Sequence, residues 1–125
     1  MRVLDDERLR SLYRFAKSLS LDVLVETHDE KEIERAVAAG CGIIGVNCRD
    51  LRTFSTDKSL IERLIGLIPP GIVRVAESGM HTREDIERAE AAGADAFLVG
   101  TALMRAAAPA AALRELLERF DSFTV

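Results

Sequence analysis

Four short apolar runs alternate with amphipathic segments along the chain, and this order limits the fold more than any other feature of the sequence. The runs have the length of buried strands and are apolar on both faces. The segments between them are much longer than the tight turns of antiparallel hairpins. The pattern therefore predicts a parallel sheet of βα units, with strands near residues 22–26, 43–47, 72–77 and 96–99.

The segments between these strands have apolar residues at helical spacing. Gly40 and Gly93 are expected to end two of the helices, and Thr82 with Asp85 three residues later is typical of a helix start. Pro109 is expected to interrupt the last helix. The predicted helices span residues 6–18, 30–39, 56–67, 82–92 and 101–120.

Part of the sequence occurs twice. Residues 28–40 and 81–93 lie 53 residues apart and are identical at eight of 13 positions. The repeat predicts a (βα)2 unit present in two copies, although the shared residues are also common in unrelated helices. Such units build the (βα)8 barrel, which typically needs about 250 residues. The 125 residues here are expected to form one α/β domain, half of a TIM barrel, which a second copy could complete.

Composition excludes several classes of function. The chain has 17 basic and 21 acidic residues, no block of like charge, and few aromatic residues, so a nucleic-acid partner is not expected. No apolar stretch is long enough to span a membrane, and the first residues carry no signal-peptide core. Cys41 and Cys48 match no metal-ligand spacing and are expected to be reduced thiols in a cytoplasmic protein.

Polar residues follow each predicted strand, at the edge where parallel α/β folds bind ligands. Glu26 ends the first strand and Asn47 the second, with Arg49 close behind. The third is followed by residues 77–79 (Glu-Ser-Gly) and the fourth by residues 100–101 (Gly-Thr). Each could be a helix cap or a solvated loop residue when taken alone. Together they predict a binding site at this edge.

Two of these turns are typical of a phosphate site. Ser78 precedes Gly79, and Gly100 precedes Thr101, where a helix is expected to begin. Glycine lets the backbone approach a ligand closely, and free N–H groups at a helix start favour an anion. The pair of turns therefore predicts binding of phosphate, or of a phosphorylated small molecule.

The ionisable residues at the same edge indicate acid–base chemistry. Glu26 and Glu77 are candidate acid/base groups, with pKa values expected to be raised by burial. Arg49 could bind a carboxylate, and Asn47 could orient a substrate. His28 and His81 are interpreted as loop or capping residues.

Two other residue types are not expected to act here. Cys48 has neighbours that could lower its pKa, but it lacks a base partner in the sequence, so we do not expect a nucleophile. The three lysines, at positions 17, 31 and 58, fall in or beside predicted helices rather than at strand ends. A lysine general acid is therefore not expected within this chain.

Four strings, at residues 24–28, 44–51, 75–80 and 97–104, together resemble the indole-3-glycerol-phosphate synthase family. The string that contains Asn47, Arg49, Asp50 and Leu51 is the most specific, because other phosphate-binding barrels share only the last two strings. The likeness runs from about Val3 to Leu117 and matches the C-terminal half of that family's (βα)8 barrel, from helix 4 through βα units 5 to 8.

The resemblance implies a reaction and a role for each matching residue. The family closes the indole ring of a carboxyphenylamino-deoxyribulose 5-phosphate with loss of carbon dioxide and water, and it uses no metal or organic cofactor. The resemblance implies that Glu26 is the acid/base group and that Asn47 and Arg49 lie near the anthranilate carboxylate and the hydroxyls. It places Glu77 and Ser78 against the substrate, and the phosphate at Gly79, Gly100 and Thr101. The family's catalytic lysines have no counterpart here.

Three interpretations of the sequence stay open. The chain could be half of such an enzyme, which binds phosphate but does not turn over alone. It could be a structural half-barrel that self-associates and leaves its inherited site unused, or a small phosphate-binding βα protein of unrelated function. The first two differ in what completes the sheet, which is either a second copy of the chain or a separate N-terminal half-barrel.

Overall fold

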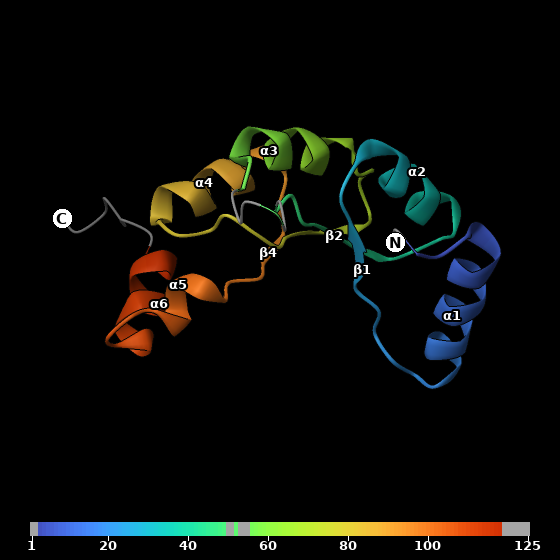
Figure 1. Ribbon diagram of the computed structural model, residues 1–125, viewed down its shortest axis with the longest axis horizontal. Helices are drawn as coiled ribbons and strands as arrows, with labels where there is room; N and C mark the ends of the chain where they lie inside the picture. Colours follow the sequence, from blue (N-terminus) through green and yellow to red (C-terminus); the bar gives the residue numbers. More distant parts are fainter. Residues whose placement is uncertain (1–2, 50–51, 53–55, 119–125) are drawn as a thin grey trace.

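The computed structural model describes residues 3–49, 52 and 56–118 of the chain. Helices and strands alternate along most of it, as Figure 1 shows. The elements are α1 (Asp6–Ser18), β1 (Val25–Thr27), α2 (Glu30–Ala38), β2 (Ile43–Val46), α3 (Lys58–Leu67), β3 (Val73–Ala76), α4 (Arg83–Ala92), β4 (Ala96–Phe97), α5 (Thr101–Met104) and α6 (Pro109–Leu117).

The four strands form one sheet in the order β1-β2-β3-β4, and every neighbouring pair is parallel. The predicted parallel βα arrangement is therefore confirmed. The first strand begins at Val25 rather than at residue 22, and its paired residues are Val25↔Ile44 through Thr27↔Val46. The extent of an edge strand depends on its single partner, and β2 itself begins only at Ile43.

Helices α2, α3 and α4 cover one face of the sheet, and the core lies between these two layers (Figure 1). Strand side chains that alternate toward the helices include Thr27, Ile44 and Val46, all with no exposed surface. The central helix α3 contributes Ile61, Leu64 and Ile65, which are equally buried. Burial of this apolar surface stabilises the fold by about 25 cal/mol per Å².

Among the described residues, no helix layer covers the opposite face of the sheet. Helix α1 lies at one end of the sheet, and α5 and α6 lie at the other (Figure 1). Leu24 and Leu98 expose 44% and 55% of their surface on this side. Ile44 in β2 does not face this side. It pairs with Val25 and Arg74 in the sheet, its side chain points toward the helices, and it is fully buried.

The two copies of the repeat fold in the same way. Asp29 caps α2 by accepting a hydrogen bond from Glu32 N, and Thr82 caps α4 by accepting one from Asp85 N. Thr82 and Asp85 also form the predicted reciprocal capping box. Gly40 and Gly93 follow the helices with φ angles of 77° and 111°, which glycine adopts without strain.

The last predicted helix is divided earlier than expected. Helix α5 ends at Met104, and Pro109 is the first residue of α6, where its missing N–H costs nothing. Residues 119–120, the end of the predicted helix, lie outside the described residues. None of the helices in the described part of the chain is long and apolar enough to cross a membrane.

Candidate functional site

A polar hollow of about 560 Å³ lies at the carboxyl ends of β2, β3 and β4. Seven of the eight predicted site residues line it, which are Asn47, Arg49, Glu77, Ser78, Gly79, Gly100 and Thr101. Residues that are up to 54 positions apart in the sequence thus share one site. The eighth, Glu26, projects from β1 and reaches the site through its contact with Glu77.

Glycine at position 45 makes room for the two glutamates to meet. Glu77 follows β3, and its carboxyl lies over Gly45 in β2. A Cβ atom at position 45 would lie 1.7 Å from Glu77 Oε1, so any larger residue would displace this carboxyl. Glu26 pairs with Gly45 across the sheet and comes from the other side. The absence of a side chain at Gly45 therefore allows the carboxyl pair to form.

The two carboxyls have different pKa values. Burial, followed by the hydrogen bond and the charge of Glu26, raises the pKa of Glu77 to about 8. The hydrogen bond from Glu77 lowers the pKa of Glu26, with further contributions from the Asn47 amide and the His28 charge, and together these outweigh burial. The expectation of a raised pKa was therefore wrong for Glu26, which is half-exposed. Near neutral pH one proton resides on Glu77, which donates it to an ionised Glu26.

The protonated state of Glu77 also follows from its surroundings. Its Oε1 atom is buried and has no hydrogen-bond partner among the described residues. Such an oxygen is costly in an ionised carboxylate, whereas a carboxylic acid is neutral and can donate from its other oxygen to the neighbouring carboxylate. The geometry and the raised pKa thus indicate the same state.

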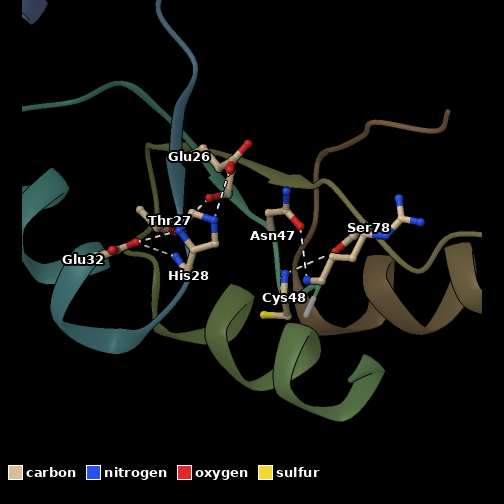
Figure 2. Close-up of polar contacts among 9 residues, drawn as sticks. Glu26, Thr27, His28, Glu32, Asn47, Cys48 and Ser78 are labelled. Carbon is tan, nitrogen blue, oxygen red and sulfur yellow. Dashed lines mark hydrogen bonds and ion pairs between the residues drawn. The ribbon is translucent and has the colours of Figure 1, made fainter. Parts of the chain in front are cut away.

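His28 belongs to the site through its imidazole ring. Its Nε2 lies 3.1 Å from Glu26 Oε1 and its Nδ1 lies 3.0 Å from Glu32 Oε2, as Figure 2 shows. The backbone N–H of His28 also donates to Glu32. The capping interpretation therefore holds for the backbone of His28, but the ring contact with Glu26 was missed. The sequence signal was weak, because a histidine at a helix start normally contacts only its own loop.

Ser78 connects the ends of β2 and β3, and Asn47 stabilises the turn after β2. Asn47 Oδ1 accepts a hydrogen bond from Arg49 N, and Ser78 Oγ accepts one from Cys48 N (Figure 2). Arg49 pairs with Thr56 in an antiparallel bridge across the intervening loop. Asp50 and Leu51, which carry part of the family resemblance, lie outside the described residues.

Cys48 is not activated. Burial, and then the charge of Asp57, raises the pKa of its thiol to about 11 and outweighs the lowering by the charge of Arg63. Cys41 is a second free cysteine and is buried in the core. In the described part of the chain no group of three or more metal-ligating side chains is placed to hold a metal ion.

The two glycine turns differ in how tightly they are enclosed. Gly79 has a φ angle of 77°, and a Cβ there would lie 2.8 Å from Thr56 Cγ2. A Cβ at Gly100 would meet nothing within 4 Å, because this residue faces open space. Thr101 and Ala102 follow as the first residues of α5, at the wall of the hollow.

Two of the other residues that line the hollow are ionisable, and sequence reasoning did not assign them to the site. Arg105 follows α5 and is a second arginine in the lining besides Arg49, and His81 lies at the start of the second repeat. Lys58 approaches Gly79 from α3, but its Nζ forms an ion pair with Asp85 at 2.6 Å. No sequence signal marked Arg105, since it lies well beyond the last strand.

A parallel sheet with a helix layer on one face and a polar site at its carboxyl edge defines an α/β protein of the TIM-barrel class. Solved structures agree with this architecture. Mandelate oxidase with (S)-4-hydroxymandelic acid matches with a TM-score of 0.68 and 26% identity, over 91% of this chain and 33% of that one. The Amycolatopsis orientalis BexX/CysO complex matches with a TM-score of 0.60 and 26% identity, over 90% of this chain and 50% of that one.

The family model for indole-3-glycerol phosphate synthase matches residues 1–116, and the chain belongs to this family. An indole-3-glycerol phosphate synthase of Koribacter versatilis is 50% identical over 91% of this chain and 44% of its own length. One of Opitutus terrae is 48% identical over 95% of this chain and 45% of its own length. The chain therefore spans less than half the length of these relatives and matches their C-terminal part, consistent with half of a barrel.

Proposed function

We propose that the chain supplies the C-terminal half of an indole-3-glycerol phosphate synthase active site. The reaction would be ring closure of a carboxyphenylamino-deoxyribulose 5-phosphate, with loss of carbon dioxide and water. The polar hollow is the main support for the proposal, because seven residues that were predicted from their positions after the strands line this one cavity. The carboxyl pair adds to it, since an acid and a carboxylate side by side can donate and accept protons at the same pH.

Each side chain has a role that its chemistry supports. Glu26 would act as the acid/base group, and Glu77 and Ser78 would face the substrate from the end of β3. Arg49 would bind the anthranilate carboxylate, and Asn47 would orient it together with the hydroxyls. None of these roles needs a metal or an organic cofactor, in line with the family resemblance.

The phosphate group would bind at the Gly79 and Gly100 turns. The first amides of α5 lie beside Gly100, and the Arg105 guanidinium lines the same wall. Gly100 offers a clean test because it lines the hollow and a Cβ atom there would meet no other atom within 4 Å. Gly100→Val should weaken binding of inorganic phosphate about tenfold, or about 1.4 kcal/mol, through loss of close backbone approach.

Calorimetric titration with inorganic phosphate measures the affinity of each variant, and urea unfolding checks that the variant is folded. Gly66→Val in α3 is the matched control, because a Cβ there meets only Ala92 O at 4.0 Å and lies outside the residues that line the hollow. It should leave phosphate affinity unchanged. Equal phosphate affinity in Gly100→Val and the unsubstituted chain would place the anion elsewhere.

We further propose that these 125 residues alone do not make indole-3-glycerol phosphate at a measurable rate. None of the described residues that line the hollow is a lysine, and Lys58 is paired with Asp85. A missing general acid typically costs about 10²–10⁴-fold in rate, and missing positioning groups add to this. Turnover by the pure chain, followed by product fluorescence, would contradict the proposal.

Association with a second copy is the proposed way to cover the open face of the sheet, and a separate N-terminal half-barrel is the alternative. An apolar hollow of about 450 Å³ lies between α1 and β1 and is lined by residues such as Leu12, Phe15 and Leu24. Exposed apolar surface of this kind favours association. The same observation supports the second candidate function, a structural half-barrel that self-associates without catalysis.

Light scattering of the purified chain tests the association. A dimer or larger assembly is expected. Leu24→Asp should shift it toward monomer, because association would then bury an unpaired charge in the interface. Leu67→Asp is the control, because Leu67 is similarly exposed, at 43%, but lies on the helix layer. A monodisperse 13.7 kDa monomer would contradict self-association. The structural function would be favoured if the assembly binds phosphate, is inactive, and is not activated by addition of an N-terminal half-barrel.

A further inference from the structure

We propose that His28 is a positioning residue for the Glu26 carboxylate and that Glu32 in turn orients His28. The three side chains form a continuous row, with Glu32 Oε2 3.0 Å from Nδ1 and Glu26 Oε1 3.1 Å from Nε2 (Figure 2). This inference deepens the proposed function, because it assigns the residues that hold the acid/base glutamate in place.

The row begins at a rigid point in the fold. Glu32 lies in the first turn of α2, and only 8% of its side chain is exposed. Its Oε2 accepts from the His28 backbone N–H at 2.8 Å, and this bond fixes the carboxylate against the ring. A carboxylate so shielded from water needs its donors, so it is expected to keep a hydrogen on Nδ1.

The far end of the ring then faces the site. An unprotonated Nε2 and an ionised carboxylate repel one another at 3.1 Å, so a hydrogen must lie between these two atoms. Glu26 thus receives hydrogen bonds from His28 on one side and from Glu77 and Asn47 on the other. These groups favour an ionised, fixed Glu26, which leaves the proton of the carboxyl pair on Glu77.

The second copy of the repeat shows that this row is specific to the first. His81 occupies the position of His28, and its backbone N–H donates to Asp85 Oδ2 in the same way. Asp85 is one methylene shorter than Glu32, and it binds Lys58 instead of a histidine ring. The backbone cap is therefore common to both copies, whereas the ring contact to a carboxylate is an addition in the first.

Nuclear magnetic resonance on the full chain tests the proposal without any need for turnover or phosphate. The first measurement is the ¹⁵N spectrum of the unsubstituted chain in weakly acidic solution, where Glu26 is ionised and both ring nitrogens of His28 should carry a hydrogen, one facing each carboxylate. The second is the titration of ¹³C-labelled glutamate carboxyls. In His28→Asn the new amide can still contact Glu32 but cannot reach Glu26, so the titration midpoint of Glu26 should move upward.

Two further variants make the result decisive. His28→Gln places a neutral donor near the position of Nε2, so its Glu26 midpoint should fall between those of the unsubstituted chain and His28→Asn. His81→Asn is the matched control and should leave Glu26 unchanged. Should His28→Asn fail to fold, the ring spectrum and the His28→Gln titration still decide the matter.

An unchanged Glu26 midpoint in both His28 variants, or a His28 ring without a hydrogen on one of its nitrogens in weakly acidic solution, would overturn the proposal. These outcomes are separate from those that test the proposed function. If Gly100→Val leaves phosphate binding unaltered while the Glu26 midpoint still responds to His28, the proposed phosphate site fails and the positioning role stands.

Discussion

The two copies of the repeat have nearly the same backbone but use their buried carboxylates differently. In both, an isoleucine and an alanine of the helix are buried, Ile33 with Ala36 in α2 and Ile86 with Ala89 in α4. In both, the carboxylate at the third helical position accepts the N–H of the preceding histidine. The residues that the copies share therefore build the fold.

The difference lies in the length of that carboxylate. Glu32 reaches the ring of His28 and through it Glu26, whereas Asp85 stays close to its own helix start and pairs with Lys58. A single methylene thus separates a carboxylate that serves the candidate site from one that joins α4 to α3. Identical histidines have different roles because their partners differ.

Removal of the second carboxylate should have the largest effect on stability. Asp85 accepts from His81 N, Thr82 N and Lys58 Nζ, and only 7% of it is exposed. Asp85→Ala is expected to lower the free energy of unfolding by about 2–3 kcal/mol, and Glu32→Ala by about 1–2 kcal/mol, because fewer groups lose a partner. Urea denaturation measures both.

The control for this comparison is Glu84→Ala, an exposed residue in the same helical turn as Asp85. It should change stability by less than about 0.5 kcal/mol.

The stability of Asp85→Ala should also depend less on acidic pH than that of the unsubstituted chain. Burial opposes ionisation of Asp85, but the bonds from Lys58 and from two backbone amides hold its pKa below the usual value. Its contribution is therefore present at neutral pH and is lost as the pH falls through that lowered pKa. At neutral pH, a loss of stability in Asp85→Ala no larger than that in Glu84→Ala would contradict the role assigned to Asp85.

The glutamates that precede the two copies should affect stability with opposite signs. Glu77 has a pKa of about 8 in the folded chain and an ordinary value of 4.5, so the folded state retains a proton that the unfolded state loses between these values. Glu77 is therefore expected to make the chain less stable as the pH rises from about 4.5 to 8, and Glu77→Gln should remove this slope.

Glu26 provides the opposite case. Its pKa is lowered on folding, chiefly by the hydrogen bond from Glu77, so its contribution is present above its ordinary pKa and is lost as the pH falls through the folded value. Glu26→Gln should thus flatten the acid side of the stability profile. Thermal unfolding over a pH series measures both variants, and parallel profiles for Glu77→Gln and the unsubstituted chain would show that the proton is not held on Glu77.

Most of the fold could be predicted because it depends on patterns that are local in the sequence. The alternation of apolar runs and helices gave the order of elements, and Thr82 with Asp85 marked the start of α4 correctly. The start of β1 and the end of α5 could not be predicted in the same way. Those boundaries depend on the pairing of β1 with β2 and on how the chain turns between Met104 and Pro109.

The candidate site was predictable in its membership but not in its electrostatics. Polar residues after buried strands pointed to the hollow, because parallel strands bring their carboxyl ends to one edge. The opposite pKa shifts of Glu26 and Glu77 depend on Gly45, whose missing side chain lets the carboxyls meet. Such a contact joins three strands, and no spacing within one segment could report it.

The helix caps should show a smaller difference between the copies. Asp29→Ala and Thr82→Ala each remove one hydrogen bond to an amide of the first helical turn, and each should cost about 1 kcal/mol. Thr82→Ala should cost slightly less, because Asp85 still accepts from the backbone N–H of residue 82. Urea denaturation checks the order, and a neutral Asp29→Ala would show that water replaces the cap in the first copy.

The smallest losses of stability are expected for the arginine that both copies share. Arg35 binds Asp6 at 2.5 Å and also the carbonyl of Leu4, so it holds α1 against α2. Arg88 binds Glu62 at 2.8 Å between α4 and α3, and the Arg88 side chain is more exposed than that of Arg35, at 49% against 28%. Exposed ion pairs contribute about 0–1 kcal/mol, and a half-exposed pair such as Arg88 with Glu62 is near the lower end. Arg35→Ala should therefore cost up to about 1 kcal/mol and Arg88→Ala a few tenths.

Salt at about 1 M should remove most of the loss in Arg88→Ala but less of the loss in Arg35→Ala, because screening weakens an ion pair more than the hydrogen bond from Arg35 to the carbonyl of Leu4. Equal losses at high salt would show that the carbonyl of Leu4 adds nothing, and that the first copy holds its preceding helix no more firmly than the second.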